Sequence, residues 1–94
     1  MGKVNRKRGR LEIIYDILKI IRDNDNSIKP TPLLRFSNLS TTGFSEYLTE
    51  LKEKGLVKEL EDKNGRKYIT LCDKGFSFLE RYRHLKGFIR EFNL

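Results

Sequence analysis

The sequence predicts a single, mainly helical α+β domain of 94 residues. Three segments with apolar residues at helical spacing come first, two β-prone segments around an Asn-Gly pair follow, and another helical segment ends the chain. A chain of this length buries one modest core and leaves little room for a second. One module is therefore expected to carry the function.

The composition fits a globular domain with a strongly basic surface. Hydrophobic residues make up 37% and charged residues 35%, and no apolar run approaches the roughly 20 residues that span a bilayer. Charges interrupt the apolar segment after the basic N-terminus, which argues against a signal peptide. The net charge of +7 favours a polyanionic partner, because binding releases the counterions of phosphates. We expect a cytoplasmic protein with no membrane partner.

The sequence offers no residues in the pattern of an enzyme. Cys72 and His84 are the single cysteine and the single histidine, so neither an internal disulfide nor a metal-ligand cluster of the usual spacing is expected. Glu59, Glu61 and Asp62 fit a solvated strand edge better than an acid and base pair. We predict no catalytic residue, no cofactor and no metal.

Residues 1–10 are expected to form a basic arm that is mobile when free, because almost nothing in them is apolar. Basic arms of this kind lie in a groove or along the backbone of DNA, which raises affinity without adding much sequence specificity. The alternative is a tail without a specific partner. The candidate contacts are Lys3, Arg6, Lys7, Arg8 and Arg10.

The first helix is expected from Leu11 to the polar run at residues 23–27, where side chains compete for backbone hydrogen bonds. Its apolar stripe is Leu11, Ile14, Leu18 and Ile21, joined by Ile13, Ile17 and Ile20. A short second helix is predicted from about Pro32 to Ser37, with Thr31 as its N-cap and Pro32 as its first residue.

A turn at Asn38-Leu39-Ser40 precedes the third predicted helix, which runs to about Lys54 and ends at Gly55 in a left-handed conformation. Its inner face consists of Phe44, Tyr47, Leu48 and Leu51. Its outer positions carry hydroxyls and charges that bond base edges or phosphates, and they are Ser40, Thr41, Thr42, Ser45, Glu46, Thr49 and Lys52. Glu46, Glu50 and Glu53 outnumber the lysines and leave this helix slightly acidic.

A hairpin follows the third helix, because β-prone residues 56–61 and 67–71 flank an Asn-Gly pair. A two-residue turn at Asn64-Gly65 would place Leu60 opposite Ile69 and Lys58 opposite Leu71. Leu56, Leu60, Ile69 and Leu71 would then share the inner face. The hairpin tip is a candidate phosphate contact through Lys63, Asn64, Arg66 and Lys67, the alternative being a solvated turn.

Asp73 is expected to cap a last helix that continues to about Phe92 and offers Phe76 and Leu79 to the core. A heptad seam runs along this helix at spacings of four and three, through Phe78, Tyr82, Leu85, Ile89 and Phe92. These residues predict self-association, the alternative being that they fold back on the first helix. We therefore divide the chain into an arm (1–10), a domain (11–75) and a dimerisation helix (76–94).

Helix, short helix, turn, helix and hairpin in this order are the winged helix arrangement, in which the third helix enters the major groove and the hairpin lies along the backbone. The chain also resembles the small archaeal winged-helix regulators, and most of all the archaeal ten-a (10a) DNA-binding proteins, from about Leu11 to its C-terminus. The matching pieces are Asn38-Leu39-Ser40, Tyr47-Leu48, Leu51, Lys54-Gly55-Leu56-Val57, Tyr68-Ile69-Thr70-Leu71, Asp73-Lys74-Gly75 and Phe78-Leu79.

The resemblance implies a dimer in which two long C-terminal helices form an antiparallel coiled coil and present two winged helices to DNA. This chain departs from the pattern at Cys72, where a polar residue, usually threonine, is common. Its last helix also stops at Leu94, soon after the domain, so a short coiled coil is expected and its orientation stays open.

These features together predict a homodimer that binds double-stranded DNA as a nucleoid-associated transcriptional regulator or chromatin protein. Two alternatives use the same residues differently. The acidic third helix could dock a protein within a larger complex, or the basic arm could bind RNA without a role for the hairpin.

Overall fold

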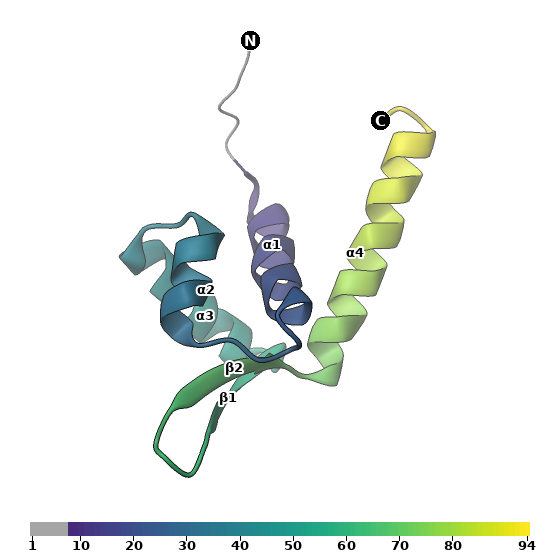
Figure 1. Ribbon diagram of the computed structural model, residues 1–94. Coiled ribbons are helices and arrows are strands. Elements are labelled where there is room, and N and C mark those ends of the chain that lie inside the picture. Colours follow the sequence, from purple (N-terminus) through teal and green to yellow (C-terminus); the bar gives the residue numbers. More distant parts are fainter. Residues whose placement is uncertain (1–7) are drawn as a thin grey trace.

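A computed structural model describes residues 8–94 and shows four helices and one antiparallel hairpin (Figure 1). In chain order the elements are α1 (Arg10–Asp23), α2 (Pro30–Ser37), α3 (Thr41–Glu53), β1 (Val57–Glu61), β2 (Lys67–Leu71) and α4 (Asp73–Glu91). This is the element order of a winged helix, so the predicted mainly helical α+β fold is confirmed. Lys3, Arg6 and Lys7 of the predicted arm lie outside the described residues.

The core gathers around α1, which lies between α2 and α3 on one side and α4 on the other (Figure 1). Buried side chains at helical spacing on α1 meet apolar side chains from every other element. The core residues are Ile14, Ile17, Leu18, Ile21, Ile28, Leu33, Phe44, Leu48, Leu51, Leu56, Val57, Ile69, Leu71 and Leu79. Leu11, predicted at the start of the α1 stripe, is instead 51% exposed.

Two helices begin earlier or with a different cap than predicted. α2 starts at Pro30, with Lys29 as its N-cap, so Thr31 does not cap it. Both prolines fit the first turn, where backbone N–H groups have no helical partner. α4 starts with Asp73 inside the helix and Cys72 at the N-cap, where no side chain caps the backbone. The carboxylate of Asp73 still lies in the first turn, where the helix dipole favours it.

The turn between α2 and α3 lies where the sequence predicted it. Asn38 adopts a left-handed conformation with φ 60° and ends α2. The Ser40 hydroxyl accepts a hydrogen bond of 3.0 Å from the Gly43 backbone N–H and so caps α3. At the other end of α3, Gly55 has φ 76°, as predicted for the residue that ends this helix.

The hairpin register differs from the predicted one by one residue. Leu60 pairs with Tyr68 and Lys58 with Thr70, whereas Leu71 pairs with Val57. The turn is longer than two residues, since the Asp62 N–H donates to the Arg66 carbonyl across Lys63, Asn64 and Gly65. Gly65 has φ 83°, which fits a type I turn followed by a left-handed residue.

This one-residue shift exchanges the faces of β1. Val57, which pairs with Leu71, is 1% exposed, whereas Leu60 is 49% exposed on the opposite face. The prediction that Leu60 belongs to the inner face is therefore wrong. Leu56 is buried as predicted, although it lies just before the strand.

The loop after α1 joins the hairpin from the other side. Ile28 and Ile69 exchange two backbone hydrogen bonds of 3.2 and 2.8 Å. The Asn26 side chain accepts from the Leu71 N–H at 2.7 Å, and the Thr70 hydroxyl donates to the Asn26 carbonyl at 2.7 Å. This arrangement fixes β2 against α1 and explains why the Thr70 side chain is buried.

α4 contributes buried side chains to the core only from its first half. Leu79 is buried as predicted, but Phe76 is 41% exposed, so its predicted place in the core is wrong. The helix then extends along α1 to a C-terminal end that lies far from the hairpin tip (Figure 1).

Candidate nucleic-acid interface

The outer face of α3 is a polar surface dominated by hydroxyl groups. All seven residues predicted to face outward are exposed, although Ser40 also serves as the N-cap. Thr42, Ser45, Glu46 and Thr49 recur at helical spacing on the side away from the buried Phe44, Leu48 and Leu51. Lys52 lies to one side, where its ammonium pairs with the Glu59 carboxylate of β1 at 3.5 Å.

One of the glutamates on α3 is neutralised by neighbours on both sides. The Glu50 carboxylate accepts from the Arg10 guanidinium and forms an ion pair of 3.1 Å with the Lys54 ammonium. These two cations lower the pKa of Glu50 from 4.5 to about 2, and the hydrogen bond from Arg10 makes the largest contribution. Glu50 is therefore ionised at neutral pH and its charge is compensated, which the count of acidic residues on α3 did not reveal.

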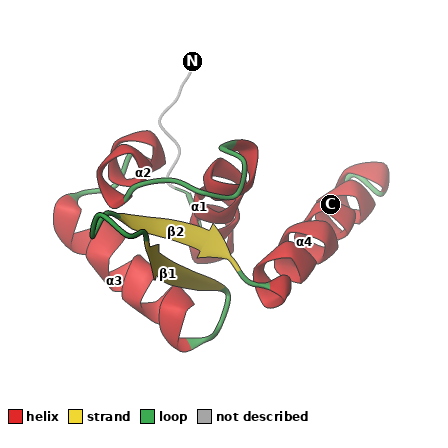
Figure 2. Cartoon of the chain, turned by 60° about the horizontal axis from the view of Figure 1, so that its bottom comes forward, coloured by secondary structure: helices red, strands yellow, loops and turns green. Residues whose placement is uncertain are grey.

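The hairpin tip, which we call the wing, presents the predicted cations to solvent. Lys63, Asn64, Arg66 and Lys67 are exposed, and within residues 8–94 none of the three cations forms an ion pair. The Asp62 carboxylate accepts from the backbone N–H groups of Asn64 and Arg66, both at 2.9 Å. These two hydrogen bonds brace the backbone of the wing, the loop that joins β1 to β2 in Figure 2.

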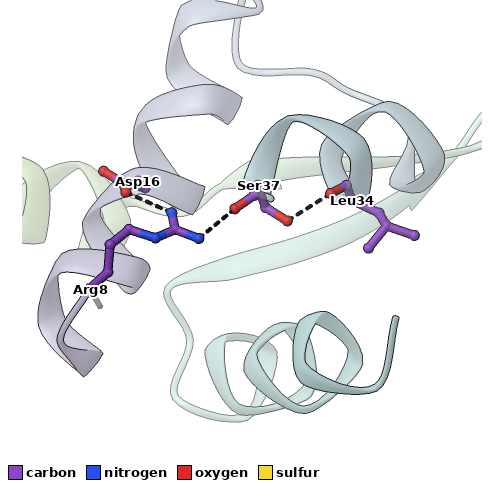
Figure 3. Close-up of polar contacts among 4 residues, drawn as sticks. All are labelled: Arg8, Asp16, Leu34 and Ser37. Atoms are coloured by element: carbon purple, nitrogen blue, oxygen red, sulfur yellow. Dashed lines mark hydrogen bonds and ion pairs between the residues drawn. The ribbon is translucent and has the colours of Figure 1, made fainter. Parts of the chain in front are cut away.

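The part of the predicted arm that the structure describes is not free. The Arg8 guanidinium donates to the Asp16 carboxylate of α1 and to the Ser37 carbonyl at the end of α2, both at 2.8 Å (Figure 3). Arg10 is the first residue of α1 and bonds Glu50. At residues 8–10 the structure differs from the expected free arm, because Arg10 already belongs to α1 and the guanidinium groups of Arg8 and Arg10 reach acceptors on three helices.

The predicted seam of α4 divides into two halves. Phe78 and Tyr82 stack with ring centroids 5.7 Å apart, and Tyr82 also lies 5.0 Å from Tyr15 of α1, as the alternative to self-association anticipated. Burial there raises the pKa of Tyr82. Leu85, Ile89 and Phe92 are between 38% and 57% exposed.

Sequence reasoning missed two residues of this apolar surface. Phe88 is 53% exposed and its ring lies 4.9 Å from that of Phe92, a contact that the i, i+4 spacing could have indicated. Leu11 of α1 faces α4 across a groove of about 240 Å³ and lines it with Phe78, Arg81, Tyr82 and Leu85. A second hollow of about 680 Å³, between Tyr15 and α4, is lined mainly by Arg83, Lys86, Phe88 and Arg90.

Two other functional classes find no support in residues 8–94. No three histidine, cysteine or acidic side chains gather there in a way that could bind a metal ion. In the same part of the chain, every helix is too short or too polar to cross a membrane.

Comparison with known proteins gives one family and several similar structures. A family model described as winged helix-turn-helix matches residues 7–90. No curated protein matches the sequence. Among solved structures, Sso10a-2, a DNA-binding protein from Sulfolobus solfataricus, has a TM-score of 0.73 at 20% identity, over 92% of this chain and 86% of its own. This match agrees with the resemblance noted in the sequence.

Two further structures share the fold. A winged-helix DNA-binding protein from STIV has a TM-score of 0.70 at 21% identity, over 84% of this chain and 90% of its own. The oxidised form of MarR from E. coli has a TM-score of 0.69 at 27% identity, over 79% of this chain but 53% of MarR. This chain thus spans about half of MarR.

The match to the winged helix-turn-helix family model agrees with the expectation that the chain is not an enzyme. Because the family model covers most of the sequence, the chain belongs to the winged helix-turn-helix family.

Proposed function

We propose that this protein binds double-stranded DNA as a homodimer and acts as a transcriptional regulator or chromatin-associated protein. α3 would enter the major groove and the wing would lie on the phosphate backbone. The observation that carries the proposal is the wing, whose three exposed cations make no ion pair within residues 8–94. Sso10a-2 and the STIV protein, which share this fold, are described as DNA-binding proteins.

The wing and the outer face of α3 would have different roles in DNA binding. The wing carries cations on a backbone held by Asp62 and therefore supplies phosphate contacts and affinity. α3 presents hydroxyls, which donate to and accept from base edges. Affinity and sequence recognition would then reside in different parts of the molecule.

The distal half of α4 supports the dimer. Leu85, Phe88, Ile89 and Phe92 form an exposed apolar surface that the single chain leaves uncovered. An antiparallel pairing of two α4 helices would place these C-terminal turns of one chain over the Leu11 groove of the other. Two-fold symmetry would then present two α3 helices to two half-sites.

Removing the wing cations tests the affinity part of the proposal. Arg66→Ala with Lys67→Ala is expected to weaken binding to all duplexes about equally and to reduce the slope of log affinity against log salt by about 1 for each phosphate that the wing no longer neutralises. Titration of labelled duplexes at several salt concentrations measures both. Lys19→Ala with Arg22→Ala on α1 removes the same charge as a control. Wild-type binding that is insensitive to salt would refute the DNA-binding proposal.

Changing the hydroxyls of α3 tests the recognition part. Thr42→Ala and Ser45→Ala are expected to change the preferred sequence, since a good base contact contributes about 1–3 kcal/mol of discrimination. Selection from a pool of random duplexes, with the wing variant as control, reads out the preference. If the α3 variants select the same sequences as the wild type, α3 is not the reader.

A further inference from the structure

The charges of α3 are unfavourable for a helix that approaches DNA. Between Thr41 and Glu53 the helix carries three glutamates and one lysine. That lysine, Lys52, is already engaged by Glu59 at 3.5 Å. Carboxylates within about 8–10 Å of a phosphate repel it with little screening at physiological salt. Compensating cations must therefore come from outside the helix.

Two such cations are in place at Glu50. One is Lys54, the C-cap of α3, and the other is Arg10, which belongs to α1 and lies 40 positions earlier in the chain. Arg10, Glu46, Tyr47 and Glu50 line one hollow of about 200 Å³ beside α3. Arg10 thus shares this hollow with two of the three glutamates and forms an ion pair with one of them, Glu50.

Arg10 is held in this place by its own helix. It is the first residue of α1, whose following turns are anchored in the core through Ile14, Ile17 and Leu18. Arg8, two residues earlier, is tied to Asp16 and to the Ser37 carbonyl. The segment that carries Arg10 is therefore fixed on both sides, and the guanidinium reaches α3 without needing to be ordered by a ligand.

We propose that Arg10 is a positioning residue for DNA binding: it neutralises Glu50 and so lets α3 approach the phosphates, and it does not itself contact DNA. This inference rests on the proposed function and deepens it. It also assigns Arg10 a role different from the phosphate contact expected of an arm residue. The two roles predict opposite outcomes when Glu50 is changed as well.

A two-by-two set of variants separates the roles by duplex affinity at fixed salt. Arg10→Gln is expected to weaken binding about 3- to 10-fold, because it removes one of the two cations that compensate the Glu50 carboxylate and leaves only Lys54. Glu50→Gln should bind at least as well as the wild type. Arg10→Gln with Glu50→Gln should return to within about twofold of the wild type. Arg10→Lys keeps the charge and should keep the affinity.

A matched pair on the same helix serves as control. Arg22 and Asp23 form an exposed ion pair of 3.1 Å at the far end of α1 from Arg10. Arg22→Gln and Asp23→Asn change charge in the same way, so their double variant should show no coupling beyond about twofold in DNA affinity.

Carboxyl NMR of the free protein gives a readout independent of DNA. In Arg10→Gln the pKa of Glu50 should rise from about 2 toward 4.5, with Lys54 holding part of the shift. An unchanged pKa would show that the pair does not form in solution and would overturn the inference.

The remaining outcomes also decide it. If the double variant binds as weakly as Arg10→Gln, Arg10 binds phosphate directly. If Arg10→Gln binds DNA as tightly as the wild type, neutralising Glu50 has no effect on binding. Either result rejects the inference and leaves the proposal of DNA binding intact. If Arg10→Gln does not fold, Glu50→Gln alone tests the inference: binding of DNA weaker than that of the wild type would reject the inference. A wild-type protein without salt-dependent duplex binding refutes the proposed function and this inference together.

Discussion

Replacing Ile89 with aspartate is expected to leave the protein monomeric. Ile89 lies in the middle of the exposed apolar surface of α4, between Leu85 and Phe92. In a paired α4 this position would be buried, and a buried carboxylate without a partner costs several kcal/mol. That cost is comparable to the free energy that a short coiled coil contributes, so the dimer should dissociate at micromolar concentration. Sedimentation velocity measures the change directly.

Gly87→Asp is the matched control for this experiment. Gly87 lies on the opposite side of α4 from Ile89, because two residues correspond to about 200° of helical rotation. Apart from its two chain neighbours and the backbone of α4 itself, nothing among the described residues lies within 4 Å of a Cβ placed there. The control should therefore stay dimeric. An Ile89→Asp variant that also stays dimeric would show that the α4 surface is not the interface.

The monomer should also bind DNA more weakly than the dimer. A dimer engages two half-sites, so the second contact forms at high effective concentration. Ile89 is far from the wing along the chain and contributes nothing to either proposed DNA surface. A loss of affinity in Ile89→Asp, with secondary structure retained, would thus report on assembly.

Gly75→Ala is expected to destabilise the fold strongly for a change of one methyl group. A Cβ at Gly75 would lie 2.4 Å from the Leu56 carbonyl oxygen and 3.2 Å from a methyl carbon of Leu71. The Leu56 carbonyl is itself held, since it accepts from the Cys72 N–H at 3.0 Å. Backbone must therefore move, and overpacking of this kind typically costs about 1–3 kcal/mol. Urea unfolding followed by circular dichroism gives the free energy.

Gly87→Ala provides the comparison on the same helix. Nothing lies within 4 Å of its added methyl group, so this change should stabilise α4 by up to about 1 kcal/mol through helix propensity alone. The two glycine substitutions should thus shift the unfolding midpoint in opposite directions. Equal shifts would mean that the close approach of Gly75 to Leu56 does not restrict the start of α4.

Local chemistry made much of the fold predictable. Apolar spacing located the helices, Asn38 and Ser40 defined the turn between α2 and α3, and Gly55 marked the end of α3. Each signal acts within a few residues, because a helical face, a cap or a left-handed glycine depends on the immediate neighbours. The folded structure therefore shows these local features close to where the sequence predicted them.

The hairpin shows where local reasoning fails. Asn64-Gly65 suggested a two-residue turn, but Asp62 accepts hydrogen bonds from two backbone N–H groups and stabilises a longer one. The strands then shift by one residue, which buries Val57 and exposes Leu60. A one-residue change in the turn thus exchanges every side chain of β1 between the two faces, and the Asn-Gly pair alone did not reveal it.

The sequence by itself determined that this protein is a basic winged helix whose C-terminal helix carries an apolar seam, because periodicity, turn residues and net charge are properties of the chain alone. Only the tertiary structure decided what the charged and aromatic side chains meet. It placed Arg8 and Arg10 against helices rather than in a free arm, and it set Tyr82 against Tyr15 while leaving Ile89 exposed. Such partners lie many positions apart in sequence, and only packing brings them within bonding distance.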